Sequence, residues 1–180
     1  ILEDSPNRII IASHLGRPKE KNDKDSLKIV LPILESLLNK KVTFLPDGLS
    51  ENTLNTLSTS SDKLFLLENL RFHKEETTYK DVKSSEAIEV FHQLSDCFVN
   101  DAFGCMHRDH LSICGTQLTD KSFGFLVNEE LSALHTITDN NSSNKILAII
   151  GGGKMDDKIK LLKNLSYKVD HVFIAGGNIN

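Results

Sequence analysis

Arginine is rare in this sequence, and its positions are the first sign of chemistry. Basic residues number 21, but only four of them are arginines: Arg8, Arg17, Arg71 and Arg108. The last three each follow a short apolar run that ends in turn-forming residues. A guanidinium group is a planar fork that binds carboxylate or phosphate through two hydrogen bonds, which an ammonium group cannot do. Three such forks past the ends of predicted strands indicate a site for a polyanion.

Nearby carboxylates offer each arginine an alternative partner. The candidates are Glu68, Glu75, Asp101 and Asp109. For one arginine alone the ion pair is the better interpretation, because surface ion pairs are common. Three arginines at equivalent positions favour the anion site instead.

A glycine-rich turn at Gly151–Gly153 is followed by Lys154, between an isoleucine-rich run and a helical pattern. Backbone N–H groups at such a turn, together with the helix dipole, favour a phosphate. The standard motifs do not fit, since Met155 replaces the Ser or Thr of a Walker A loop and Asp156 the last glycine of G-x-G-x-x-G. Lys158, one turn after Lys154, would add a second cation. A tight turn with a solvated lysine is the alternative.

A group of thiols and imidazoles could hold zinc. The residues are Cys105, His107, His110 and Cys114, and two thiolates with two imidazoles are a common tetrahedral set. Arg108 lies inside the group and would repel a dication, and zinc fingers separate their ligand pairs by longer segments. A zinc-binding module is therefore the less favoured alternative.

Short apolar runs alternate with amphipathic segments along the chain. The predicted strands, mostly without polar alternation as in strands covered on both faces, are residues 8–13, 42–45, 64–67, 97–99, 146–150 and 172–175. Helical spacing predicts helices near 31–38, 87–94, 128–137 and 159–165. The alternation predicts an α/β fold, a Rossmann-like parallel sheet with helices on both faces. Ligands of such sheets bind beyond the carboxyl ends of the strands, where the three arginines fall.

One segment has the composition of a linker. Residues 139–144, D-N-N-S-S-N, separate a helical pattern from the strand that leads into the glycine-rich turn. We therefore predict a first domain over residues 1–127 and an interdomain helix with its linker over 128–144. The first β-α-β unit of a second domain follows over 145–180.

The overall composition excludes several classes of protein. The 180 residues carry 21 basic and 25 acidic side chains, a net charge of −4, whereas nucleic-acid binding requires a cationic face. No apolar run approaches the roughly 20 residues that cross a bilayer. Three cysteines without a secretory prefix do not make a disulfide framework. We predict a cytoplasmic protein that binds neither nucleic acid nor membranes.

Several segments together resemble phosphoglycerate kinase, in the order in which that family has them. They are S-H-L-G-R-P at 13–18, L-E-N-L-R-F-H-K-E-E at 67–76, V-N-D-A-F-G at 99–104, H-R-D-H at 107–110, G-F-L at 124–126, G-G-G-K-M-D-D-K-I at 151–159 and F-I-A-G-G at 173–177. These segments extend over nearly the whole chain, which makes the resemblance specific.

The resemblance implies a two-domain hinge enzyme of glycolysis, which moves a phosphoryl group between bisphosphoglycerate and ADP to give 3-phosphoglycerate and ATP. It implies a substrate patch of His14, Leu15, Gly16, Arg17, Arg71 and Arg108. The implied nucleotide side is Gly152, Gly153, Lys154, Asp157, Lys158 and Gly177. Lys154 would follow the transferring phosphoryl group. Mg²⁺ is expected with ADP or ATP, held mainly outside this chain, and the enzyme is expected to be a monomer.

The sequence departs from the family's pattern at several positions. Cys105–Met106 stand where the family usually has Thr-Ala, and Asp109 stands where it has a small residue. The Asp109 carboxylate, beside Arg108, is expected to weaken anion binding. Phe123 replaces a small residue, and Asn178–Ile179 replace Met-Ala.

Both ends of the chain look like cut ends. The resemblance places the family's first strand before Ile1 and most of the nucleotide domain after Asn180. We therefore expect a fragment that is inactive alone. The alternative is a non-catalytic protein of the same fold, which binds the anion but has lost phosphoryl transfer.

Overall fold

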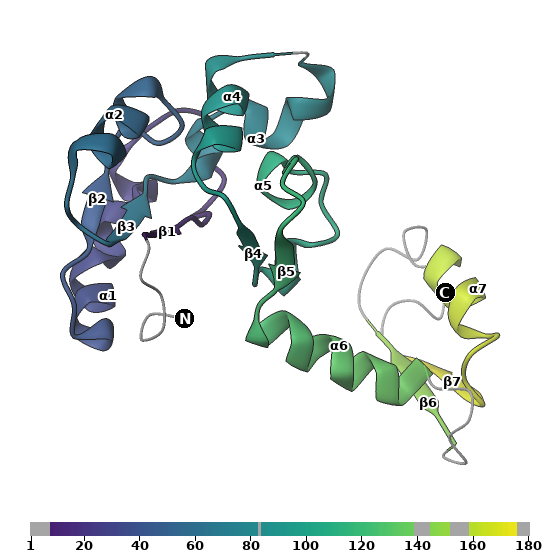
Figure 1. Cartoon of the computed structure of the whole chain (residues 1–180). Helices are drawn as coiled ribbons and strands as arrows, with labels where there is room; N and C mark the ends of the chain where they lie inside the picture. The colour runs from purple at the N-terminus through teal and green to yellow at the C-terminus, as the bar shows by residue number, and fades with distance from the viewer. Residues whose placement is uncertain (1–7, 83, 139–144, 152–158, 176–180) are drawn as a thin grey trace. The chain divides into compact units, whose positions relative to one another are not determined.

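The structure, a computed structural model, describes residues 8–82, 84–138, 145–151 and 159–175. The chain divides into two compact units, Ile1–Gly124 and Phe125–Asn180. Both units contain parallel strands and helices (Figure 1), which confirms the predicted α/β class.

Three parallel strands form the main sheet of the first unit, in the order β1-β3-β2. The strands are β1 (Ile9–Ile11), β2 (Thr43–Leu45) and β3 (Leu64–Leu67). All residues of the central strand β3 are buried, as expected for a strand covered on both faces. Ile11 pairs with Leu66 and Leu45 with Leu67, so the three strands end at one edge of the sheet.

A second parallel sheet in the same unit pairs β4 (Phe98–Asn100) with β5 (Lys121–Phe123). The sequence predicts one sheet, whereas the described strands of this unit are divided between two. It does not predict β5 at all, because this strand has only three residues, all of them exposed.

Helix α1 (Leu31–Leu38) begins where the sequence predicts it. A 3-10 turn over Leu27–Val30 precedes it, and Pro32 lies in the first helical turn. The missing N–H of proline costs no hydrogen bond there. Asn39 ends the helix in the left-handed conformation, with φ of 48°.

Helix α4 (Glu86–Gln93) also lies at a predicted position, and the hydroxyl of Ser85 caps it by accepting from the Ile88 N–H. Helix α2 (Glu51–Thr59) is not predicted, because Asn, Thr and Ser are weak helix formers and its apolar stripe is narrow. Two one-turn helices, α3 (Glu75–Thr78) and α5 (Leu111–Cys114), are too short for a periodic pattern.

The core of the first unit lies on both faces of the main sheet. Phe65 and Leu67 of β3 belong to a cluster that includes residues of α2 and α4. Leu64 and Leu66 point to the opposite face, as alternate strand residues do, and pack in a second cluster with residues of α1. Helices therefore cover both faces, as predicted.

The second unit contains a β-α-β arrangement, as the sequence predicts. Its elements are α6 (Phe125–Thr138), β6 (Leu147–Ile150), α7 (Ile159–Leu165) and β7 (His171–Ile174). β6 and β7 are parallel neighbours. Helix α6 includes the segment 128–137 that the sequence predicts to be helical.

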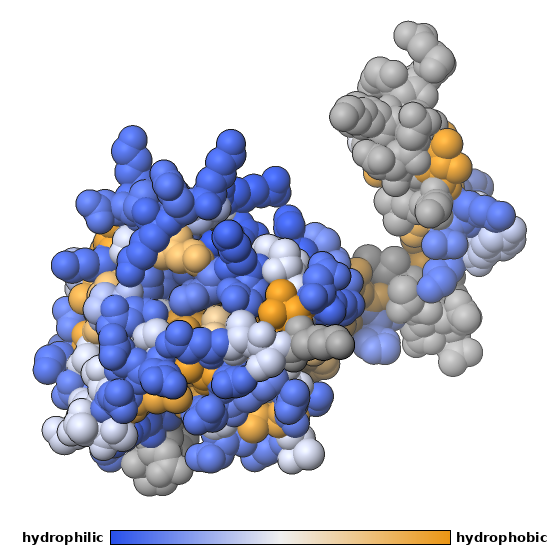
Figure 2. All heavy atoms as spheres, turned by 90° about the horizontal axis from the view of Figure 1, so that it is seen from above, coloured by the Kyte–Doolittle hydropathy of each residue, from blue (hydrophilic) through white to orange (hydrophobic). Residues whose placement is uncertain are grey.

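The surface of the first unit is mostly hydrophilic on the face seen in Figure 2, with small apolar spots between polar side chains. Ile33 and Leu37 of α1 are exposed apolar residues of this unit. Among the helices that the structure describes, none has the length and apolar character needed to cross a bilayer.

The half-buried side chain of His73 predicts a pH-dependent stability. Its Nε2 accepts a hydrogen bond from the Leu49 N–H at 2.9 Å, so this nitrogen carries no proton. Burial lowers the pKa of His73 below 6.5, and this effect outweighs the opposing effect of Glu75. Just below that pH the unfolded chain binds a proton that the folded chain does not. We therefore expect the free energy of unfolding to fall as the pH drops from about 7 through 6.5 and below.

Urea denaturation at a series of pH values tests this expectation. The variant His73→Gln keeps an acceptor for Leu49 but does not titrate, so its stability should depend less on pH in this window. His110, whose pKa is also lowered by burial, should account for part of the remaining dependence. An unchanged pH profile in His73→Gln would contradict the prediction.

Candidate functional site

The loops after β1, β3 and β4 carry the arginines that are predicted to bind an anion. Arg17 follows β1 and is exposed, and Arg71 lies in the 3-10 turn Leu70–Phe72 directly after β3. Arg108 comes after the turn Phe103–Cys105, which follows β4. Because β1 and β3 are parallel neighbours, Arg17 and Arg71 lie past the same edge of the sheet.

The side chain of Asn69 ties these loops together at the end of β3. It is completely buried, and its oxygen accepts from the N–H groups of Leu15 at 3.2 Å and Arg71 at 3.1 Å. Its amide nitrogen donates to the carbonyl oxygens of Leu15 at 2.7 Å and Asp25 at 2.8 Å. The amide thus uses both of its N–H groups and accepts two hydrogen bonds. One buried side chain therefore fixes three segments around the site.

Gly16 brings the loop of Arg17 against Arg71. The Arg71 Nη1 donates a hydrogen bond to the Gly16 carbonyl oxygen. Gly16 has φ of +61°, and a Cβ at this position would lie 2.2 Å from Asp25 Oδ1. Glycine is therefore the residue that fits without strain. Arg17 is the next residue after Gly16, so the hydrogen bond from Arg71 to Gly16 also holds the backbone of Arg17 in place.

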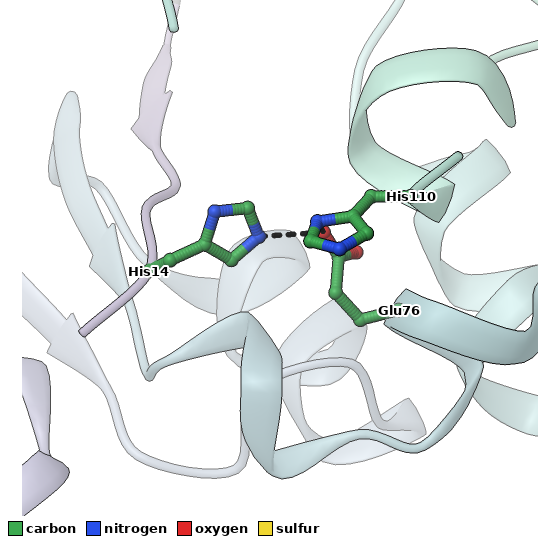
Figure 3. A group of neighbouring side chains, drawn as sticks. All are labelled: His14, Glu76 and His110. Atoms are coloured by element: carbon green, nitrogen blue, oxygen red, sulfur yellow. Dashed lines mark hydrogen bonds and ion pairs between the residues drawn. The ribbon is translucent and has the colours of Figure 1, made fainter. Parts of the chain in front are cut away.

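A buried carboxylate lies at the centre of the site (Figure 3). Glu76 of α3 has no exposed surface, and its Oε1 accepts from His14 Nε2 at 2.5 Å. The hydroxyl of Ser112 donates to the same oxygen at 2.6 Å, and the Ser112 N–H donates to Oε2 at 3.2 Å. Glu76 therefore joins the loop after β1 to helix α5.

His110 completes this cluster from the side of α5. Its ring packs edge to face against that of His14, with centroids 5.3 Å apart. Its Nδ1 lies 3.3 Å from Glu76 Oε1, but the direction does not make a hydrogen bond, so this buried nitrogen has no hydrogen-bond partner among the described residues.

Charged groups of both signs act on His110. Burial is the main cause that lowers its pKa, Glu76 opposes this, and His14, Arg71 and Arg108 lower it further. Both arginines are thus close enough to act on one imidazole. The ring of His14 packs against that of His110, both arginines act on His110 as positive charges, and the Arg71 guanidinium binds the carbonyl oxygen of Gly16, the residue before Arg17.

Two of the carboxylates considered as arginine partners have other partners. Glu68 accepts from the Ser26 hydroxyl at 2.7 Å and from the Leu27 N–H at 2.8 Å. Asp109 pairs with Lys80, Nζ to Oδ1, at 2.8 Å, and the hydrogen bond from Lys80 is the main cause that lowers the pKa of Asp109. The Asp109 carboxylate is therefore engaged by Lys80, which weakens the expectation that it opposes anion binding at Arg108.

The proposed zinc ligands do not come together. His110 belongs to the buried cluster with Glu76, whereas Cys114 Sγ lies 3.8 Å from the Arg108 carbonyl oxygen and 3.9 Å from Asp109 Oδ1. Cys105, His107 and Cys114 join no metal-ligand group in the part of the chain that the structure describes. The zinc-binding module is therefore not supported.

A different trio has the side chains of a metal site. The candidate ligand atoms of His14, Glu76 and His110 lie within 4.8 Å of one another, the one such group among the described residues. Glu76 Oε1 already accepts two short hydrogen bonds, and Arg71 and Arg108 act on His110 as positive charges that oppose a further cation. These hydrogen bonds and positive charges count against a metal cation in this cluster.

The nucleotide side of the sequence prediction falls outside the described residues. This holds for Gly152, Gly153, Lys154, Asp157, Lys158 and Gly177. Asn69, Glu76 and Ser112 were not among the site residues predicted from the sequence. Asn69 and Glu76 are part of the L-E-N-L-R-F-H-K-E-E segment. Their role is to hold other residues of the site in place, and neither residue type nor spacing predicts such a role.

Comparisons with known proteins agree on one family. A family model described as phosphoglycerate kinase matches residues 1–180. The phosphoglycerate kinases of Debaryomyces hansenii and Kluyveromyces lactis are 47% and 44% identical over 189 aligned positions, which include 98% of this chain and 45% of each relative. This chain thus spans less than half the length of these relatives.

Solved structures show the same likeness. The structure of phosphoglycerate kinase from Coxiella burnetii superposes with a TM-score of 0.76 at 33% identity, over 94% of this chain and 42% of that one. The enzyme from Pyrococcus horikoshii gives a TM-score of 0.76 at 26% identity, over 94% of this chain and 43% of that one. With a family model that matches from the first residue to the last, the chain belongs to the phosphoglycerate kinase family.

Proposed function

We propose that this chain forms the 3-phosphoglycerate side of a phosphoglycerate kinase. The observation that carries the proposal is the bond of the Arg71 guanidinium to the Gly16 carbonyl oxygen, next to Arg17, beside the buried cluster of His14, Glu76 and His110, on which Arg71 and Arg108 act as positive charges. The Arg71 guanidinium binds a backbone oxygen and not a carboxylate, so its charge remains available to a ligand. Guanidinium groups suit a ligand that carries both a phosphate and a carboxylate.

The residues of the first unit would bind and orient the substrate. Arg17, Arg71 and Arg108 would neutralise the phosphate and carboxylate, and His14 would lie beside them. Leu15 and Gly16 would contribute backbone to the same loop, which Asn69 holds in place. Phosphoryl transfer passes through a loose transition state, so the protein's part is to position the groups and to supply positive charge.

The nucleotide side of the proposal comes from the sequence and the family. Gly152, Gly153, Lys154, Asp157, Lys158 and Gly177 would contact ADP or ATP, with Lys154 following the transferring phosphoryl group. Mg²⁺ would arrive with the nucleotide and neutralise its phosphates. Residues 1–127 would form the substrate domain, 128–144 the interdomain helix and linker, and 145–180 the start of the nucleotide domain. We further propose that the full-length enzyme is a cytoplasmic monomer.

Binding and turnover test different parts of this proposal. Titration calorimetry of the 180-residue chain with 3-phosphoglycerate should show binding that exceeds the binding of inorganic sulfate, a smaller anion without a carboxylate. A coupled kinase assay should show turnover with the full-length protein and none with the 180 residues, because the chain spans only 45% of its relatives. An absence of 3-phosphoglycerate binding, or an inactive full-length protein, would overturn the proposal.

A further inference from the structure

We propose that Glu76 is a positioning residue, whose buried carboxylate fixes the ring nitrogens that His14 and His110 present to the anion. This inference rests on the proposed function, because it assumes that an anion occupies the arginine site. Nothing in the family comparisons or in the sequence motifs assigns this task to Glu76.

The placement of the Glu76 carboxylate suits this role. Glu76 is completely buried on α3, yet its partners come from two other segments, His14 after β1 and Ser112 of α5. The two hydrogen bonds from Ser112 hold both oxygens and so fix the plane of the carboxylate. A carboxylate held in this way can set the orientation of the imidazoles around it, as carboxylates behind metal-bound histidines do.

Each imidazole of the cluster has one ring nitrogen near Glu76. The two nitrogens of a histidine lie on different edges of the ring, and each can donate or accept. His14 uses Nε2 toward Glu76, so Nδ1 is the nitrogen that is left for a ligand. His110 directs Nδ1 toward the same oxygen, so its free nitrogen is Nε2. One carboxylate oxygen thus selects opposite nitrogens on the two rings (Figure 3).

One ring nitrogen of His110 can gain a hydrogen bond when an anion binds. The residue is 6% exposed, and its Nδ1 lacks a hydrogen bond although Glu76 Oε1 is 3.3 Å away. A small rotation of the ring would let Nδ1–H donate to Glu76. An anion at Nε2 would favour that rotation and the doubly protonated ring, because the ring would then donate to negative groups on both edges. Substrate binding should therefore take up a proton.

The charges that face these groups set the size of this effect. Arg71, Arg108 and His14 disfavour a proton on His110, and Glu76 favours it. His73 is a further titratable neighbour that responds to Glu76. An anion would offset the two arginines, so that the charge of Glu76 decides whether the ring of His110 is protonated.

Nitrogen-15 NMR of the histidine side chains of the wild-type chain tests the geometry directly. The signals of His14 and His110 are assigned by comparison with His14→Gln and His110→Gln. We expect neutral His14 to carry its proton on Nε2 and neutral His110 on Nδ1. Spectra that show the opposite tautomers would overturn the proposal, and this test requires no substitution of Glu76.

The variant Glu76→Gln tests the role of the carboxylate, because it keeps the shape, removes the negative charge and replaces one acceptor oxygen by an NH2 donor. We expect 3-phosphoglycerate affinity to fall about tenfold or more, the proton uptake measured in buffers of different ionisation enthalpy to disappear, and the tautomers to become mixed. The matched control, Glu75→Gln, makes the same chemical change one residue away and should leave all three properties unchanged.

The outcomes separate this inference from the proposed function. Folded Glu76→Gln with wild-type affinity and proton uptake would overturn the positioning role and leave the proposed function intact. Wild-type chain with the expected tautomers but no 3-phosphoglycerate binding would overturn the proposed function and, with it, the role of Glu76. If Glu76→Gln does not fold, Ser112→Ala loosens the carboxylate without altering its charge, and unchanged tautomers and affinity in that variant would overturn the proposal.

Discussion

Replacing Asn69 by aspartate is expected to lower the free energy of unfolding by about 3 to 5 kcal/mol. The aspartate has the same shape but loses both N–H donors, which leaves the carbonyl oxygens of Leu15 and Asp25 facing a carboxylate oxygen at a completely buried position. Each unsatisfied buried group costs about 1 to 3 kcal/mol, and the buried carboxyl adds its own desolvation. Urea denaturation followed by circular dichroism measures this change.

Asn55→Asp is the matched control for this substitution. Asn55 lies on α2 with an exposed side chain, so the same chemical change there should alter stability by no more than about 0.5 kcal/mol. Equal losses in the two variants would show that the charge alone matters, and an unchanged stability in Asn69→Asp would contradict the role given to this amide.

Arg71→Ala is expected to weaken 3-phosphoglycerate binding by about 10- to 150-fold, which corresponds to about 1.5 to 3 kcal/mol for a lost hydrogen bond to a charged group. The substitution removes a guanidinium that faces the site and also its bond to the Gly16 carbonyl, which holds the loop of Arg17. Arg71→Lys keeps the charge but not the fork, so we expect an intermediate loss. Titration calorimetry of the three proteins gives the comparison.

Arg8 provides a control of the same residue type. Its guanidinium donates to the carbonyl oxygens of Leu57 and Ser60 rather than to the site. Arg8→Ala should therefore lower stability without changing the affinity of the folded protein for 3-phosphoglycerate. A similar loss of affinity in both alanine variants would show that Arg71 acts through folding and not through the ligand.

The sequence predicts the parts of the fold that depend on apolar periodicity. The run Leu64–Leu67 is the central strand, and Pro32 marks the start of α1 because its ring is compatible only with the first helical turn. Helix α2 escapes prediction because tertiary packing of Thr53 and Leu57, not intrinsic propensity, stabilises it. Strand β5 is not predicted because it pairs with β4 through backbone groups, and its side chains show no apolar pattern.

The site divides in a similar way. Arg17, Arg71 and Arg108 can be predicted because a rare residue type recurs after strands, and strands of a parallel sheet end together. Glu76 and Ser112 cannot, because their contact joins residues 36 positions apart through side chains of common types. The buried position of Glu76 is visible only after α3 and α5 have packed.

The order of strands in the main sheet has a consequence for synthesis on the ribosome. Among the described residues, both β1 and β2 pair with β3, which is made after either of them. Strand β1 therefore stays unpaired until the residues of β3, Leu64–Leu67, have left the exit tunnel. Until then its apolar residues Ile9–Ile11 are open to chaperones and to other nascent chains, so the speed of translation across the intervening codons should influence how much of the protein folds correctly.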